Sequence, residues 1–228
     1  MRPDVRISAQ LTQDAANLLA EAAERGGHIV ITGGSTPKAA YTRLAELGAD
    51  WSRTEVWFTD ERCVPPDHEQ SNFKMANDSL LSKIKPRGVH RMQGELGPDD
   101  GTVEYDKELV TVFGPGVVPA FDLILLGLGP DAHCASLFPG NPELGIRDAN
   151  VTGVPQPGMA PLVPRITLTL PVLNAGAQVV FLVSGEEKAD AVARAFKGPP
   201  TPDAPSSLVE PRGEYILLCD RAAAKHLQ

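Results

Sequence analysis

The segment from Phe121 to Gly140, FDLILLGLGPDAHCASLFPG, constrains the fold more than any other part of the chain. It opens with the apolar run Phe121–Leu128, which is too short to span a membrane and is typical of a strand buried on both faces of a sheet. Gly127 and Gly129 then allow a tight turn or the close approach of a ligand. Because open α/β sheets bind ligands at the carboxyl ends of central strands, the polar residues that follow are candidates for function.

Asp131 and His133 come directly after this break, and the residues from Ala135 to Leu137 are expected to open a helix. Histidine is a candidate acid or base because its unperturbed pKa of about 6.5 lies near neutral pH. The alternative is a histidine that only caps or packs a turn. The strand, the glycines and the Asp-x-His spacing occur together, and this combination favours function.

GLGPDAHCASLFPG resembles the signature of the 6-phosphogluconolactonases, with two departures. That family usually has glycine where Ala132 stands and commonly threonine where Cys134 stands. Ala132 therefore places a side chain where the turn calls for unusual backbone angles. The resemblance covers nearly the whole chain and keeps the family's order: GGSTP, DER to SNFKMA, HRMQGE, the signature, PRITLTL, GEEKA and the terminal strand.

A glycine–serine loop, GGSTP, follows the expected strand His28–Thr32. Its glycines let the chain turn with N–H groups exposed, and either Ser35 or Thr36 can cap the helix that follows. Exposed N–H groups and the helix dipole then form a natural phosphate seat. A plain strand-to-helix turn is the alternative. The family resemblance favours phosphate or sugar contact by Gly34, Ser35 and Thr36.

A second polar group, Asp60-Glu61-Arg62, lies at the end of the expected strand Glu55–Thr59. An arginine fork can grip phosphate oxygens, and an adjacent carboxylate can hold the arginine in position. A surface ion pair is the alternative, but the strand end and the family-like continuation favour binding by Asp60 and Arg62. Asn72 begins an expected helix to Ile84, and it either contacts the ligand or caps the helix.

Two further cations come from the second half of the chain. Arg165 follows the proline-rich and glycine-rich loop 150–164, and the resemblance of PRITLTL to the family makes it a candidate for phosphate or substrate binding. Lys188 stands in the first turn of an expected helix, where the helix dipole is unfavourable to a cation unless an anion lies nearby. A solvated lysine is the alternative. Strand ends gather at one edge of the sheet, so Arg62, Arg165 and Lys188 are expected to converge on one cleft with the glycine–serine loop.

Five apolar strands separated by helices predict one α/β domain over residues 1–228. We expect a mostly parallel, doubly wound sheet with helices on both faces. The alternating segment Ile166–Leu170 is expected as a half-exposed strand that adds an antiparallel edge. Arg221–Leu227 is expected as a short closing helix.

Composition excludes several classes of partner. The net charge is −8 without any block of basic residues, which argues against nucleic acid or an anionic membrane as partner. No apolar run approaches the roughly 20 residues of a membrane span, and no secretion signal precedes the first helix. Three widely spaced cysteines (Cys63, Cys134 and Cys219) without a CxxC pair suit reduced thiols in a cytoplasmic protein and give no metal site. A monomer or weak dimer is expected.

The resemblance implies hydrolysis of 6-phosphogluconolactone to 6-phosphogluconate in the oxidative pentose phosphate pathway. His133 would assist the attack of water and Asp131 would orient it, with no metal and no organic cofactor. Isomerases and deaminases of amino-sugar phosphates share the fold and are the alternative enzyme, with Asp60 as the base; CASLFPG favours the lactonase. A sugar-phosphate sensor would bind without turnover. Related sensors in transcriptional regulators carry a DNA-binding helix-turn-helix. The first core strand of this chain is expected by His28, which leaves no room for one.

Overall fold

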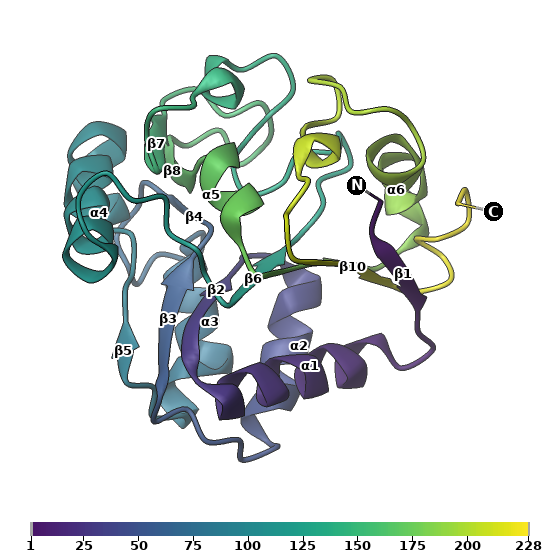
Figure 1. The fold of residues 1–228 in the computed structure, drawn as a ribbon, viewed down its shortest axis with the longest axis horizontal. Coiled ribbons are helices and arrows are strands. Elements are labelled where there is room, and N and C mark those ends of the chain that lie inside the picture. Colours follow the sequence, from purple (N-terminus) through teal and green to yellow (C-terminus); the bar gives the residue numbers. More distant parts are fainter. Residues whose placement is uncertain (1, 228) are drawn as a thin grey trace.

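A computed structural model describes residues 2–227, and its centre is a sheet of seven parallel strands (Figure 1). Every neighbouring pair in this sheet is parallel, which confirms the predicted mostly parallel architecture. In spatial order the strands are β1 (Asp4–Ile7), β10 (Glu214–Cys219), β9 (Gln178–Val183), β6 (Leu123–Leu126), β2 (Gly27–Ile31), β3 (Thr54–Phe58) and β5 (Gly88–Val89).

Helices cover both faces of the sheet, as predicted, because side chains of its strands alternate between two apolar layers. In β2, Ile29 and Ile31 belong to one layer and Val30 to the other. The first layer is closed by α1 (Leu11–Arg25), α2 (Ser35–Ala45) and α3 (Asn72–Ser79). The second is closed by α4 (Gly97–Phe113), α5 (Leu170–Ala175) and α6 (Ala189–Phe196).

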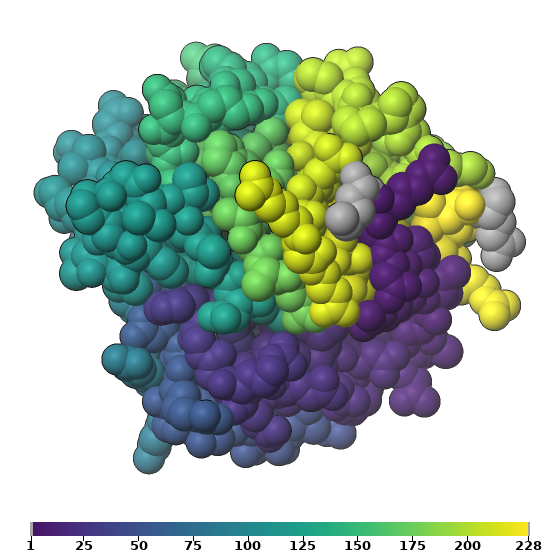
Figure 2. All heavy atoms as spheres, in the orientation of Figure 1, coloured from purple at the N-terminus to yellow at the C-terminus, as the bar shows by residue number. Residues whose placement is uncertain are grey.

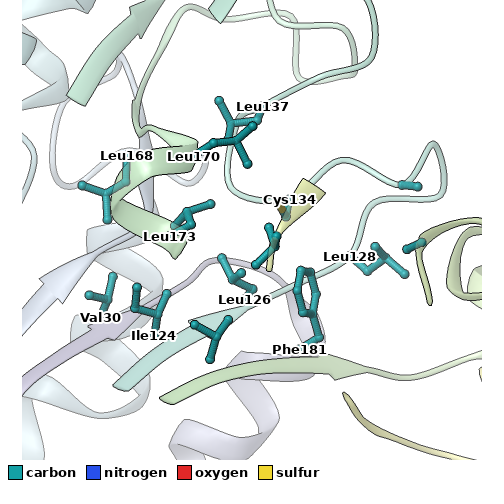
Figure 3. Close-up of a cluster of buried hydrophobic side chains, with 14 of the residues drawn as sticks. Val30, Ile124, Leu126, Leu128, Cys134, Leu137, Leu168, Leu170, Leu173 and Phe181 are labelled. Carbon is teal, nitrogen blue, oxygen red and sulfur yellow. The ribbon is translucent and has the colours of Figure 1, made fainter. Parts of the chain in front are cut away.

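The second layer carries the segment that follows β6 (Figure 3). Cys134 and Leu137 of this segment pack into the same buried cluster as Leu126 and Phe181 of the central strands. The burial of apolar side chains on both sides of His133 therefore fixes the position of the chain around it.

A smaller antiparallel sheet lies beside the main one and corrects two expectations. Its order is β4 (Asp60–Arg62), β8 (Arg165–Leu168) and β7 (Val151–Val154), so the segment 150–164 contains a strand, and β8 is a central strand in place of an edge. All four residues of β8 are buried. Ile166 faces α4, where a side chain on Gly101 would come within 2.4 Å of its Cδ1 atom. Thr167 faces the opposite way but is also covered.

The two edge strands of the main sheet, β1 and β5, were not predicted from the sequence. All four residues of β1 are exposed, so β1 shows no hydrophobic pattern, and β5 is only two residues long. Figure 2 shows the amino-terminal segment beside carboxyl-terminal ones, in keeping with the β1–β10 pairing. The predicted helix Arg221–Leu227 is wrong, since this segment forms turns in which two of three backbone hydrogen bonds span three residues.

Five short 3-10 helices complete the description. The predicted helix to Ile84 ends at Ser79 and is followed by η1. The five are η1 (Leu81–Lys83), η2 (Gly94–Leu96), η3 (Pro142–Gly145), η4 (Glu186–Lys188) and η5 (Pro205–Leu208). Over residues 2–227, no helix combines the length and the apolar character needed to cross a membrane.

Candidate active site

A cavity of about 230 Å³ opens beyond the carboxyl ends of β2 and β6. These strands are neighbours, but the chain leaves β2 toward β3 and leaves β6 toward β9 on the other side, which creates the crevice where α/β sheets bind ligands. Nine of the ten candidate residues line this cavity: Gly34, Ser35, Thr36, Asp60, Arg62, Asn72, His133, Arg165 and Lys188. The tenth, Asp131, contacts His133.

The turn that carries His133, residues 129–135, departs from the expected strand-to-helix geometry. Ala132 and Ala135 have φ angles of 68° and 48°, in the left-handed region that residues with a side chain rarely adopt. Ala135 in this conformation prevents the helix predicted from residue 135, and the chain instead closes an isolated bridge between Cys134 and Leu137. Gly129 is required here, because a Cβ atom on it would lie 2.0 Å from His133 Nδ1.

Asp131 fixes the imidazole of His133. Its Oδ1 atom lies 2.5 Å from Nδ1 and also accepts a hydrogen bond from the backbone N–H of His133 at 3.2 Å. Burial acts to raise the pKa of Asp131, but the hydrogen bonds from His133 prevail and the pKa is lowered. Since Nδ1 is occupied, Nε2 is the ring nitrogen left for chemistry in the cavity.

The glycine–serine loop enters α2 without a side-chain cap. Gly34 is the N-cap residue with φ 117°, and no side chain caps it, so the predicted capping by Ser35 or Thr36 is wrong. Both residues instead belong to the first turn of α2 and line the cavity. Gly33 leaves space for the Asn72 side chain, because a Cβ atom at residue 33 would lie only 2.0 Å from Asn72 Oδ1.

Asp60 and Asn72 form a buried polar pair. The Asn72 amide donates to the Asp60 backbone carbonyl at 2.9 Å, and Asp60 Oδ2 accepts from Ser136 Oγ at 2.7 Å. The helix cap is Ser71, whose Oγ accepts from the Lys74 N–H. The alternative in which the Asn72 side chain caps α3 is therefore excluded. Ser136 is a site residue that the sequence interpretation missed, although it stands in the same motif as His133.

Glu61 does not hold the guanidinium group of Arg62 in place. Its two carboxylate oxygens accept four hydrogen bonds: one from the backbone N–H of Arg62 and three from the start of α3. Burial raises the pKa of Glu61, and these four hydrogen bonds oppose the shift. The Arg62 guanidinium donates instead to the Gln70 carbonyl at 2.8 Å, and its Nε atom is buried without a partner.

Arg165 lies opposite Arg62 in the β4–β8 pairing and is 3% exposed. Its Nη2 atom donates to the carbonyls of Met159 and Pro161, and its guanidinium carbon lies 5.1 Å from the centre of the Phe138 ring. Burial lowers the pKa of Arg165, and the neighbouring Asp60 opposes this shift. The Arg165 Nε atom is also buried without a partner. Arg62 and Arg165 are paired across β4 and β8 and both line the cavity, so two cations favour an anion there.

Lys188, the last residue of η4, brings a third cation to the cavity. Burial lowers the pKa of Lys188, and the nearby carboxylates of Glu187 and Asp131 oppose that shift. Within residues 2–227, no group of three or more His, Cys, Asp or Glu side chains is arranged to hold a metal ion. The cavity thus combines three cations, one oriented histidine and the amino end of α2.

Comparison with known proteins identifies the family. Residues 4–218 match the model of the family described as glucosamine-6-phosphate isomerases/6-phosphogluconolactonase. The chain belongs to this family. Among its curated members, the 6-phosphogluconolactonase of Synechocystis is 40% identical over 213 residues, which cover 90% of this chain and 87% of the relative. That of Streptomyces coelicolor is 37% identical, with 91% and 85% covered.

Solved structures of the family have the same architecture. The 6-phosphogluconolactonase from Trypanosoma cruzi superposes with a TM-score of 0.89 at 28% identity, covering all of this chain and 97% of the other. A monomeric glucosamine-6-phosphate deaminase has a TM-score of 0.82 at 20% identity, covering 99% and 100% of the two chains. The second similarity shows that the deaminase shares the fold, as the sequence interpretation expected.

Proposed function

We propose that this member of the family hydrolyses 6-phosphogluconolactone to 6-phosphogluconate in the oxidative pentose phosphate pathway. The observation that carries the proposal is that His133, held through Nδ1 by Asp131, lines the same cavity as three cations. A phosphorylated lactone needs both parts: a site for its anionic phosphate and an acid–base group beside its carbonyl carbon. The curated relatives of similar length, named 6-phosphogluconolactonase, support this activity.

The proposed chemistry uses one histidine twice. Nε2 of neutral His133 removes a proton from water as the water oxygen attacks the lactone carbonyl carbon. The resulting imidazolium is stabilised by the Asp131 carboxylate at Nδ1, 2.5 Å away. When the tetrahedral intermediate collapses, the bond from C1 to the ring oxygen breaks and His133 returns its proton to that oxygen. The ring is thereby opened to a carboxylic acid and a hydroxyl group, and the acid then releases its proton to solvent as the carboxylate forms.

The three cations together face the two negative charges of the reaction, on the phosphate and on the oxyanion. We assign the substrate phosphate and the developing oxyanion to Arg62, Arg165 and Lys188 as a group, with the amino end of α2 (Gly34, Ser35 and Thr36) completing the phosphate seat. Asp60 and Asn72, which are buried and hydrogen-bonded to each other, are assigned to the sugar hydroxyl groups. No step of this scheme calls for a metal ion or an organic cofactor.

The test is direct turnover of lactone generated in situ, with the release of acid followed in a pH-stat. The lactone also opens spontaneously, so the rate without protein must be subtracted. We expect rapid hydrolysis that saturates with substrate. A rate equal to the spontaneous rate, with substrate still bound, would contradict the enzyme and favour a sugar-phosphate sensor.

The second candidate is an isomerase or deaminase of an amino-sugar phosphate. It is favoured by Asp60, a carboxylate at the cavity that is only 4% exposed and is oriented by Ser136. In that chemistry Asp60 would move a proton between C2 and C1 of an open-chain sugar. Release of ammonia from glucosamine 6-phosphate, with no effect on the lactone, would select this candidate.

Three wider expectations stay predictions: a single domain over residues 1–228, a cytoplasmic location, and a monomer or weak dimer. The net charge of −8 still gives no reason to expect nucleic acid or a membrane surface as partner.

A further inference from the structure

Ser206, far from the cavity in sequence, makes a double contact with the His133 turn. Its backbone N–H and its hydroxyl both donate to the Ala132 carbonyl, at 3.0 and 2.8 Å. Ser206 therefore contacts the residue immediately before His133 with two donors and is itself fully buried.

The turn needs such support because Ala132 has a φ angle of 68°. An alanine prefers the right-handed or extended regions to this one by roughly tenfold or more. Inside the turn, the Ala132 N–H donates to the Gly129 carbonyl and the Gly129 N–H donates to the His133 carbonyl, each at 2.9 Å. These local bonds hold the turn closed only while Ala132 keeps its unfavourable angle.

Ser206 is well placed to hold that angle because its own segment is fixed. It belongs to η5, and the next residue, Ser207, accepts a hydrogen bond from the Thr201 N–H at 2.8 Å and donates to the Thr201 carbonyl. At the far end of η5, the Asn174 amide donates to the Leu208 carbonyl at 3.2 Å. The two donors of Ser206 thus project from a braced segment onto one carbonyl.

We propose that Ser206 is a positioning residue for catalysis, which holds Ala132 in the left-handed conformation and thereby aims His133 into the cavity. The contribution to catalysis rests on the proposed lactonase activity, while the contribution to the turn does not. Removing the hydroxyl leaves one donor on the Ala132 carbonyl and lets Ala132 leave its strained angle for part of the time. His133 is then misaligned during that fraction of time.

The test begins with hydrogen exchange of the folded protein, measured by mass spectrometry on peptides that cover residues 129–135. In Ser206→Ala we expect exchange of these amides to quicken about tenfold, the effect of losing roughly one hydrogen bond. Ser79→Ala is the matched control, because Ser79 is also buried and its hydroxyl donates to a backbone carbonyl, that of Met75. Equal exchange over residues 129–135 in both variants would overturn the proposal. If Ser206→Ala does not fold, Ser206→Cys under reducing conditions supplies a somewhat larger side chain with a weaker donor, and the same comparison is made with it.

A double-mutant cycle with Ala132→Gly separates positioning from general stability. Glycine occupies the left-handed region without a steric penalty, so the turn no longer depends on the clamp. Ser206→Ala should lower kcat about tenfold with little change in KM, and should lower it clearly less in the Ala132→Gly background. Additive effects of the two changes would overturn the proposal. Absence of hydrolysis by the wild-type protein would instead refute the proposed function, and the exchange experiment would still decide the role of Ser206.

Discussion

His133 follows the central strand β6, His90 follows the edge strand β5, and both contact carboxylates. Their side chains are similarly covered, at 15% and 21% exposed, so burial does not distinguish them. The difference lies in the ring nitrogens. Both nitrogens of His90 are engaged, by Glu108 at 3.2 Å and by Glu55 at 3.3 Å. His133 has only Nδ1 engaged, and the residue lines the cavity.

The surroundings extend the contrast. His90 is stacked on Trp57, with ring centres 3.8 Å apart and planes within 7° of parallel, so one face of its ring is covered by the indole. The His133 ring lies 4.5 Å from the Phe138 ring, centre to centre, and is tilted by 43° relative to it. A histidine whose nitrogens are both engaged by carboxylates stabilises the fold, whereas one fixed at a single nitrogen is oriented and still able to move a proton. The comparison makes His133 the functional histidine and His90 the structural one.

The largest expected effect is on turnover. His133→Ala should lower kcat by about a hundredfold to ten-thousandfold, the usual contribution of an acid–base group, while substrate still binds. His90→Ala should leave kcat within about twofold because His90 does not line the cavity. Both rates are measured at saturating lactone with the spontaneous rate subtracted. A His133→Ala enzyme that keeps most of its activity would remove His133 from the mechanism and direct attention to Asp60.

The next effect concerns the anion site. Arg165→Lys keeps a positive charge but loses the planar fork, so kcat/KM should fall roughly a hundredfold, as when a preorganised donor to a developing charge is lost. Arg147→Lys is the control, because Arg147 also donates to backbone carbonyls, those of Leu144 and Ile146, but does not line the cavity. If the two variants lose kcat/KM to the same extent, Arg165 has no special role toward the substrate.

A smaller effect concerns stability, and here His90 matters more than an exposed histidine. His90→Ala removes the ring stacked on Trp57 and leaves Glu55 and Glu108 without their shared partner. We expect the free energy of unfolding to fall by about 1–3 kcal/mol in urea titrations followed by circular dichroism. His226→Ala, which removes an exposed histidine bonded to Asp190, should change it far less. Equal losses in the two variants would show that His90 is not the structural histidine we describe.

The smallest effect depends on pH. The pKa of Asp131 is lowered in the folded protein, so the carboxylate contributes stability that is fully present above its unfolded pKa, about 4. That stability disappears as the pH falls through the lower, folded value. Asp131→Asn should therefore be less stable than the native protein at pH 7, by about 1 kcal/mol or less, and the two should converge by about pH 2. A difference that persists unchanged in acid would mean that the ionised carboxylate is not its source.

The sequence predicted those features that depend on local pattern. Apolar runs located the central strands, and glycines with polar residues at strand ends located the cavity, because parallel strands bring their carboxyl ends to one edge. Patterns that depend on distant partners were missed. β1 has no apolar face and exists through pairing with β10. β8, expected as a half-exposed edge, is instead buried as the central strand between β4 and β7.

The His133 turn marks another limit. The sequence indicated that Ala132 would strain the turn, but not that Ala135 would share the left-handed conformation and prevent a helix. It also gave no sign of Ser206, since a contact between residues 74 positions apart leaves no trace in local spacing.

The most direct test of the division between binding and chemistry is a crystal structure with 6-phosphogluconate bound. The account predicts that the phosphate contacts at least two of Arg62, Arg165 and Lys188, and that the C1 carboxylate lies within hydrogen-bonding distance of His133 Nε2. A phosphate seated beside His133, with C1 directed away from it, would contradict the account.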